Sequence, residues 1–590
     1  MSSHKSLIRL SSAAFALITL ASCAVDPARA PVEASSVAAA KAVDAAQFGQ
    51  ASSAGLFLSA QAAIAAGDYE TAAPLFEQAS RGDPDDAYLR GRAFLAELLA
   101  GDIDQAGAAA NQGVVGSDDS LAGLAGLTRA VIAMDKGRAA DALLILNTRT
   151  ALGPHGVAAD LLRPWAAAMA GDWTGAAALS SDSSDKLVAA FGGLSRAQLL
   201  ERAGRAQEAE AAYRQLAASR EVLFTLAQGA FLERNGRKDE AAKLYAEALQ
   251  KAPGEDGLVD AQARLKAGGA APPLPTLRQG AAQALLNPAA LLIADRQNEM
   301  GLAYLRLTLT LDPHKGEAWL LTAESLSNLG DEAGARRAYA QIQPGDPSYS
   351  SARSRLALSY EQAGDVKTAL SIAEATFKAL PQDPGVQVVY AELLRSDSQF
   401  DAAIKILTSV IASKPEGGGA AANARLYYLR GANEERSGRW QEAESDLRQS
   451  LKLEPNEAEV LNYLGFAWVD RGEHLKEALD MLQRAVALSP DSGAIVDSLG
   501  WARYRMKDYG GAVKDLEKAV LLEASDAEIN DHLGDAYWRA GRHTEAVYQW
   551  RQVLSLHPDE KLRQTVESKV RDGLKDGAAN SLAQTVSPAA

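Results

Sequence analysis

Few residues of this 590-residue chain have the types and spacings that carry out chemistry. The seven histidines form no His-Glu-x-x-His motif, and the chain holds no Gly-x-x-x-x-Gly-Lys-Ser/Thr phosphate loop and no Gly-x-Ser-x-Gly nucleophile elbow. His532 and His543 fall in different predicted helices, which favours two polar helix residues over a metal site. We therefore expect no catalytic residue, no metal site and no cofactor, and we expect that the protein is not an enzyme.

The sequence predicts a specific chemical modification for one side chain, that of Cys23, the single cysteine of the chain. It follows a short basic segment and an apolar run at 13–21, which is too short to span a bilayer and is typical of a signal peptide. The residues Leu20-Ala21-Ser22-Cys23 resemble a bacterial lipobox, in which the cysteine is acylated and begins the mature protein. We therefore predict a lipoprotein signal peptide at 1–22, with a plain signal peptide or a buried thiol as the alternative.

The residues around Cys23 and the charge of the chain also bear on location and partners. Ala24, rather than Asp, follows the cysteine, so the lipobox resemblance implies the periplasmic face of the outer membrane. Residues 23–55 are predicted to be the lipidated cysteine and a flexible tether. The formal net charge of -15 argues against a nucleic-acid partner, because phosphate binding needs clustered Lys and Arg.

The rest of the chain must supply the elements that position any binding residues, and its clearest feature is a repeat. Residues 460–490, 495–525 and 529–558 share one pattern, in which a glycine is followed by an alanine and then, four residues later, by a large side chain. The glycines are Gly465, Gly500 and Gly534, the alanines are Ala478, Ala512 and Ala546, and the large residues are Leu482, Leu516 and Trp550. This period is typical of the tetratricopeptide repeat (TPR), a pair of helices with small residues where they cross. Such repeats bury their apolar faces only by stacking, and the stack presents a concave surface.

The small residue of the second helix recurs along most of the chain. Before residue 254 it falls at Ala72, Ala106, Ala142, Ala176, Ala209 and Ala241, each preceded by a glycine predicted to open the turn (Gly67, Gly101, Gly137, Gly171, Gly204 and Gly236). After residue 280 it falls at Gly301, Ala335, Ala369, Ala403, Ala443, Ala478, Ala512 and Ala546. We therefore predict an all-α TPR solenoid of about 14 repeats in two arrays.

The predicted domain boundaries follow from where this marker stops. Residues 56–253 form a degenerate N-terminal array and 281–558 a C-terminal array. Between them, 254–280 is rich in Pro and Gly and is predicted to be a linker. Residues 559–590 are expected to form a capping helix and a disordered tail.

Candidate binding residues come from the first helix of each repeat, whose positions 5, 9, 12 and 13 usually face the ligand in TPR proteins. Aromatic residues beside Arg and Asp are typical of protein-binding hot spots. The alternative is that Trp501, Tyr504 and Trp538 pack against the next helix as core. The predicted protein-binding groove consists of Tyr428, Arg436, Asn462, Phe466, Asp470, Asp497, Trp501, Tyr504, Arg505, Asp531, Asp535, Trp538 and Arg539.

The repeats also carry a family resemblance. The phrases LNYLGFAWVDRG, IVDSLGWARYR and INDHLGDAYWRAGR resemble those of large TPR lipoproteins of proteobacteria, a family that includes the outer-membrane adaptor of a periplasmic carboxyl-terminal processing protease. The resemblance covers roughly the 95 residues from 460 to 554. It implies a scaffold that presents cell-wall hydrolases to the protease.

Two functions of different classes remain open. The first is a non-enzymatic, lipid-anchored scaffold that binds a periplasmic protease, its peptidoglycan hydrolase substrates, or both. The second is a regulatory or structural lipoprotein of envelope machinery, such as an activator of peptidoglycan synthesis or an outer-membrane assembly or secretion component. The sequence does not name the partner, say which array binds it, or fix whether the protein is an oligomer.

Overall fold

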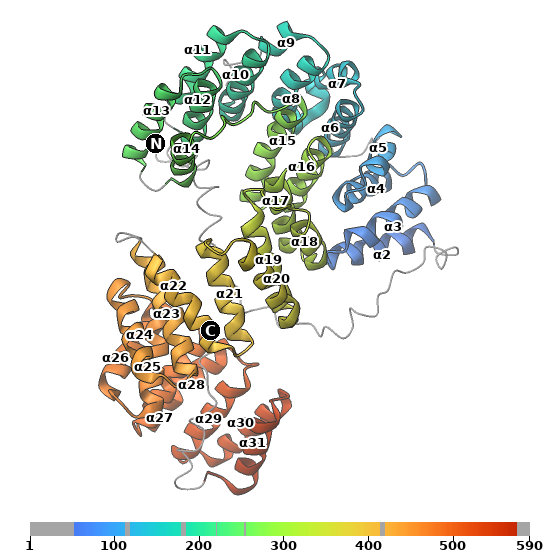
Figure 1. The fold of residues 1–590 in the computed structure, drawn as a ribbon. Coiled ribbons are helices and arrows are strands. Elements are labelled where there is room, and N and C mark those ends of the chain that lie inside the picture. The colour runs from blue at the N-terminus through green and yellow to red at the C-terminus, as the bar shows by residue number, and fades with distance from the viewer. Residues whose placement is uncertain are drawn as a thin grey trace, which may run out of the picture. The chain divides into compact units, whose positions relative to one another are not determined.

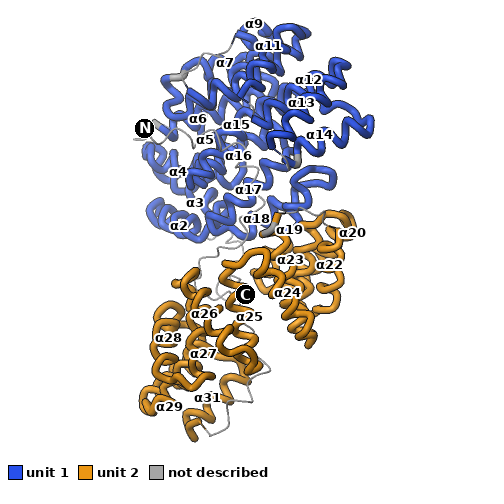
Figure 2. The backbone as a smooth tube through the Cα atoms, turned by 90° about the vertical axis from the view of Figure 1, so that its left-hand side faces the viewer, with its two compact units in different colours: residues 1–356 blue, residues 357–590 orange. Residues whose placement is uncertain are grey.

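The computed structural model describes residues 52–112, 119–178, 185–219, 221–252, 255–413 and 419–574, and these residues form about thirty helices and no strand (Figure 1). The predicted all-α TPR solenoid is confirmed. The chain divides into two compact units, residues 1–356 and 357–590 (Figure 2). The division falls inside α19 (Tyr349–Gln362), and not at the linker predicted for 254–280.

Unit 1 begins with six helix pairs, in which we call the earlier member the first helix. The first helices are α2 (Ser53–Ala65), α4 (Ala87–Ala100), α6 (Asp119–Asp135), α8 (Gly156–Met169), α10 (Gly193–Arg202) and α12 (Val222–Arg234). The second helices are α3 (Tyr69–Gly82), α5 (Ile103–Asn111), α7 (Ala139–Leu146), α9 (Trp173–Ala177), α11 (Ala206–Ala217) and α13 (Lys238–Lys251), with a 3-10 turn at Arg149–His155 and a π turn at Val188–Gly192. The unit continues with α14 (Asp256–Lys266), α15 (Leu277–Ala294), α16 (Asn298–Leu311), α17 (Gly316–Asn328) and α18 (Glu332–Tyr339).

Unit 2 continues the alternation of first and second helices. After α19 come α20 (Val366–Ala379), α21 (Pro384–Ser396), α22 (Phe400–Ser413), α23 (Ala420–Arg436), α24 (Trp440–Leu453), α25 (Ala458–Arg471) and α26 (Leu475–Leu488). The last helices are α27 (Gly493–Arg505), α28 (Tyr509–Leu522), α29 (Ala527–Arg539), α30 (His543–Ser555) and α31 (Glu560–Asp572). The helix expected after residue 558 is α31, which packs against α30.

The marker residues lie where the repeat pattern predicts. Every marker alanine, from Ala72 in α3 to Ala546 in α30, is on a second helix and is 0% exposed. The six glycines predicted to open turns in the first array all have a positive φ, between 73° and 94°. Only glycine adopts this backbone without strain, so these residues end the first helices and turn the chain.

The predicted close crossings of first and second helices are also present. A Cβ atom added at Gly500 would lie 2.6 Å from the side chain of Leu516, and one added at Gly534 would lie 2.4 Å from Trp550. At Gly465 the corresponding distance to Leu482 is 3.0 Å. The glycine therefore lets the large residue of the second helix lie against the backbone of the first.

The main difference from the sequence expectation lies in unit 1, where the predicted linker is part of the fold. Its residues form α14 and the start of α15, and then α15 and α16 pack against the earlier first helices α8, α6 and α4. A Cβ atom at Gly280 in α15 would lie 2.1 Å from the Trp165 ring in α8, and His155 Nδ1 is 2.7 Å from the Tyr304 hydroxyl in α16. Local sequence pattern did not show this, because the contacting residues are more than a hundred positions apart.

No helix among the described residues is long and apolar enough to cross a membrane. The signal peptide at 1–22, Cys23 and nearly all of the tether lie outside the described residues, as does the tail after 574. These features stay predictions.

Candidate protein-binding surface

The thirteen predicted groove residues lie on four successive first helices of unit 2, which are α23, α25, α27 and α29. Equivalent positions in successive repeats fall on one side of the stack, because each repeat is one helix pair. Burial nevertheless divides the set. Seven residues are buried (Asn462, Phe466, Asp497, Trp501, Tyr504, Asp531 and Asp535), five are half-buried (Tyr428, Asp470, Arg505, Trp538 and Arg539), and Arg436 is exposed.

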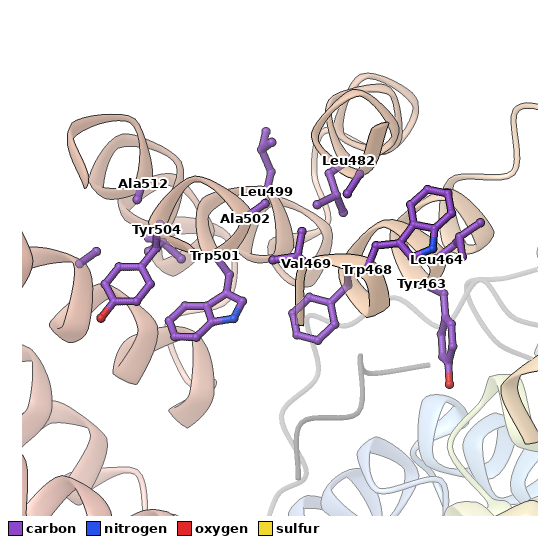
Figure 3. Packing of buried hydrophobic residues seen from close by; sticks show 14 of the residues in the cluster. Tyr463, Leu464, Trp468, Val469, Leu482, Leu499, Trp501, Ala502, Tyr504 and Ala512 are labelled. Carbon is purple, nitrogen blue, oxygen red and sulfur yellow. The ribbon is translucent and has the colours of Figure 1, made fainter. Parts of the chain in front are cut away.

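The aromatic residues of α27 belong to the largest hydrophobic cluster of unit 2 (Figure 3). The Trp501 ring is 9% exposed and stacks on Tyr504, with ring centroids 4.7 Å apart and an interplanar angle of 10°. Its other stacking partner is His532 of the next first helix, at 4.1 Å. Of the two alternatives for Trp501 and Tyr504, the packing is that of core residues, and a role in partner binding stays a prediction.

Asp497 and His532 form a buried acid-base contact between α27 and α29. His532 Nδ1 lies 2.9 Å from Asp497 Oδ2, and both side chains are about nine-tenths buried. Burial alone would lower the pKa of His532, but the carboxylates of Asp497, Asp531 and Asp535 together raise this pKa to about 9. The predicted groove residue Asp497 therefore links two neighbouring repeats.

A second buried contact joins α29 to the last helix. Lys569 Nζ of α31 lies 2.7 Å from both Asp531 Oδ2 and Asp535 Oδ1, and Lys569 is 6% exposed. Asp535 also accepts a hydrogen bond from Trp550 Nε1 at 3.1 Å. Burial raises the pKa of Asp535 to about 6, although the Lys569 ammonium acts in the opposite direction. Asp531 and Asp535 are thus the counter-ions of Lys569, and these contacts join α29 to α31.

Two further predicted groove residues have distinct surroundings. Trp538 is half-buried between the rings of His543 and Trp550, at 4.2 Å and 5.4 Å, and it lies against Gly573. Asn462 is 6% exposed, and its Oδ1 atom has no hydrogen-bond partner among the described residues. A buried acceptor without a donor is costly, and this position of Asn462 inside the stack does not by itself make it a binding residue.

Four of the predicted residues form what we call the rim row, which consists of Arg436, Asp470, Arg505 and Arg539. They lie in the last turns of α23, α25, α27 and α29, at intervals of 34, 35 and 34 residues. Arg505 Nη1 is 3.3 Å from Asp470 Oδ1, and Arg505 Nη2 donates to the Asp470 carbonyl at 3.1 Å. Arg436 is exposed and the other three are half-buried, as are Tyr428 and Trp538, so the rim row contains the charged residues of the predicted groove that are not fully buried.

Sequence reasoning missed the residues that complete these contacts. Lys569 lies in a helix predicted only as a cap, and His532 was read as a polar helix residue. Spacing within one repeat identifies the carboxylates but not the cation that a neighbouring helix brings to them. The aspartates at equivalent positions of α27 and α29, Asp497 and Asp531, were the available signal, because carboxylates buried between helices need basic partners.

A cavity of about 220 Å³ lies in unit 1 between α3, α4 and α16 to α18. Arg306 lines it and donates from Nε to the Leu99 carbonyl at 3.1 Å. Burial lowers the pKa of Arg306 to about 10. Arg337 and Glu70 close another side of the cavity with an ion pair of 2.7 Å. Helices from the start of the unit, α3 and α4, and later helices, α16 to α18, therefore line the same cavity.

Stacked helix pairs with side chains at equivalent positions of each first helix define a helical-repeat protein. Such a stack presents an extended surface that can bind a partner. Three separate stretches match family models for the tetratricopeptide repeat, at residues 63–122, 194–256 and 276–562. The chain is a tetratricopeptide-repeat protein, and proteins of this kind are typically non-catalytic scaffolds that bind other proteins.

Known proteins resemble parts of this chain. The TPR repeat-containing protein PA4667 of Pseudomonas aeruginosa is 31% identical over 209 residues, which cover 35% of this chain and 34% of the relative. The chain therefore matches about a third of the length of that relative.

Solved structures show likeness at lower identity. The Cut9-Hcn1 hetero-tetramer of the APC/C matches at 16% identity with a TM-score of 0.38, covering 88% of this chain and 96% of the matched chain. A tetratricopeptide repeat protein from Parabacteroides merdae matches at 16% with a TM-score of 0.36, covering 44% and 99%. PilW, a type IV pilus biogenesis factor, matches at 19% with a TM-score of 0.33, covering 37% and 98%.

Proposed function

We propose that this TPR protein is a non-enzymatic scaffold anchored by lipid at Cys23 to the periplasmic face of the outer membrane. Its role there is that of an adaptor that brings a periplasmic processing protease together with its cell-wall hydrolase substrates. The lipobox at 20–23 and the repeat phrases at 460–554 support this proposal. Anchoring raises the effective concentration of the bound proteins at the membrane, which is how a scaffold without chemistry of its own changes a reaction rate.

The rim row is the observation that carries the binding function. It places three guanidinium groups at one equivalent position of a repeated helix, one of them exposed and two half-buried. Arginine forms paired hydrogen bonds with carboxylates, so the rim row fits an acidic segment of a partner protein. The alternative is a purely structural role, in which these arginines only stabilise the C-terminal ends of their helices.

A pull-down from solubilised membranes, followed by mass spectrometry, tests the proposal. The test variant carries Arg436→Glu, Arg505→Glu and Arg539→Glu. The matched control carries Lys452→Glu, Lys476→Glu and Arg551→Glu, which make the same charge change at exposed residues of second helices. We expect the test variant to lose a protease or a hydrolase that the control retains.

Two outcomes of this experiment, and one outcome of a separate fractionation of the Cys23→Ser variant, count against the proposal. Equal capture by both variants would remove the rim row as the binding surface. Capture of peptidoglycan synthases or outer-membrane assembly proteins in place of a protease would favour the regulatory or structural alternative. Persistence of Cys23→Ser in the outer-membrane fraction with its palmitate label would refute the anchor.

A further inference from the structure

The segment between α14 and α15, residues 267–276, is held in a way that its sequence does not explain, and we call it the closing segment. None of its ten residues is buried, and Pro272 and Pro273 are exposed. Apolar burial therefore contributes little to its position. At its start, Gly268 and Gly269 donate main-chain hydrogen bonds to the Leu265 and Arg264 carbonyls. Residues 270–275 accept hydrogen bonds from arginine side chains at their main-chain carbonyl groups.

Three arginines donate these hydrogen bonds, one each from α10, α12 and α14. Arg264 Nη1 of α14 donates to the Ala270 carbonyl at 2.7 Å, and Arg234 Nη1 of α12 donates to the Pro272 carbonyl at 2.8 Å. Arg202 Nη2 of α10 donates to the carbonyls of Leu274 and Pro275, at 3.2 Å and 2.6 Å. The arginines, which we call the carbonyl stripe, thus follow the closing segment from one end to the other.

Two of these arginines are oriented by the same set of neighbours in successive repeats. Arg234 forms a double contact with Glu201 of the preceding first helix, at 2.8 Å for both pairs of atoms, and Tyr213 donates to the same carboxylate at 2.9 Å. One repeat later, Arg264 forms two contacts of 2.7 Å with Glu233, which also accepts from Tyr245 at 2.8 Å. The carboxylate binds one side of the guanidinium group and leaves another N–H to reach a carbonyl.

The closing segment is chemically matched to such a row of donors. Its three prolines have no N–H group, so main-chain acceptors outnumber main-chain donors in the segment. The arginines of the stripe contact carbonyl groups, and proline holds a peptide in an extended, non-helical conformation that a flexible Gly-Ser sequence does not maintain. The arrangement is that of a receptor and an extended peptide, with both halves on one chain.

We propose that the carbonyl stripe of α10, α12 and α14 is a binding site for extended, proline-containing peptide segments, and that residues 270–275 are its built-in occupant. A partner peptide of the same chemistry must displace the closing segment, none of whose residues is buried. Because the segment is attached to α14 and α15, its effective concentration at the stripe is high, of the order of millimolar. The site is independent of the rim row in unit 2.

The test uses the full chain with residues 268–275 replaced by an eight-residue Gly-Ser sequence, which empties the stripe. Thr276 is kept because its hydroxyl caps α15 by accepting from the Gln279 amide at 3.2 Å. The probe is a fluorescent peptide with the sequence of residues 268–276 and blocked ends, and a Gly-Ser peptide of equal length is the control. Binding is measured by fluorescence anisotropy.

We expect saturable binding of the probe to the emptied chain and at least tenfold weaker binding to the intact chain. Arg202→Ala in the emptied chain should weaken binding by about tenfold, because charged hydrogen bonds are lost. Arg205→Ala, which changes an exposed arginine that pairs with Glu208, should leave binding unchanged. A folded, emptied chain that does not bind the probe, or that binds the Gly-Ser peptide equally well, would overturn the proposal.

A second measurement needs no emptied chain. In the otherwise intact protein, Arg202→Ala should make the Ala270–Ala271 bond several-fold faster to cleave with elastase, whereas Arg205→Ala should not. Equal cleavage rates in the two variants would show that the stripe does not hold the segment, and would contradict the proposal.

Discussion

The two units are built from the same helix pairs but use the faces of their first helices differently. In unit 1, α15 and α16 pack on α4, α6 and α8, and the closing segment follows α10, α12 and α14, so the chain covers its own first helices. In unit 2, the main contacts among the described helices join neighbours along the stack. The buried contact between Asp497 and His532 joins the neighbouring first helices α27 and α29, and the rim row is not fully buried.

This difference shows how a repeat protein divides its surface. A first-helix face that binds its own chain contributes to stability, and one that stays open is available to a partner. The same kind of helix pair thus packs on other parts of its own chain in unit 1, and in unit 2 it carries the surface that we propose binds a partner. Four changes test the comparison, in order of expected effect.

The largest effect should come from Lys569→Met, which removes a buried cation of unit 2. Asp531 and Asp535 would then lie close together without the ammonium group that contacts both of them, at a cost of about 3–5 kcal/mol in the free energy of unfolding. Chemical denaturation measures this cost, and the exposed Lys561→Met on the same helix is the control. A loss below about 1 kcal/mol would show that the pair does not hold the end of the unit.

Trp501→Ala tests whether the aromatic residues of α27 are core or interface. Truncation of a buried tryptophan should cost about 3–5 kcal/mol of folding free energy, and the folded variant should retain its partner affinity. Tyr548→Ala, at a tyrosine that is 67% exposed, is the control. An unchanged melting temperature together with lost capture would restore Trp501 to the binding surface.

Gly280→Leu tests the self-packing of unit 1. The new side chain would meet the Trp165 ring, and overpacking of this kind costs about 1–3 kcal/mol or more. Gly510→Leu in α28 is the control, because a Cβ atom there meets nothing within 4 Å. If both substitutions lower the melting temperature equally, the contact of α15 with α8 does not define unit 1.

A smaller effect is expected from pH through His532 in unit 2. The pKa of His532 is raised in the folded protein to about 9, above its ordinary value of 6.5. Its stabilising contribution is therefore complete below pH 6.5 and is lost as the pH rises through 9, by roughly 2 kcal/mol. Denaturation curves at pH 6.5 and pH 9 measure the loss, and His532→Gln should abolish this part of the pH dependence. Equal dependence in both proteins would mean that Asp497 and His532 are not coupled.

The sequence predicted the features that repeat and missed those that join distant repeats. Ala512 and Gly500 were placed correctly because their roles depend on contacts inside one helix pair, which recur every 34 or 35 residues. Lys569 and the closing segment were missed because their partners lie in other repeats, where no local pattern identifies them. Trp501 was ambiguous for the same reason, since the ring that covers it belongs to the next first helix.

The most direct test of the comparison is site-specific photo-crosslinking in intact membranes. A photoreactive amino acid at position 436, in the rim row, should give adducts with other proteins. The same probe at position 273, in the closing segment, should give only crosslinks within the chain, to α10 or α12. Intermolecular adducts at 273 with none at 436 would contradict the claim that the closing segment occupies the carbonyl stripe of unit 1 in the resting protein while the rim row of unit 2 binds the partner.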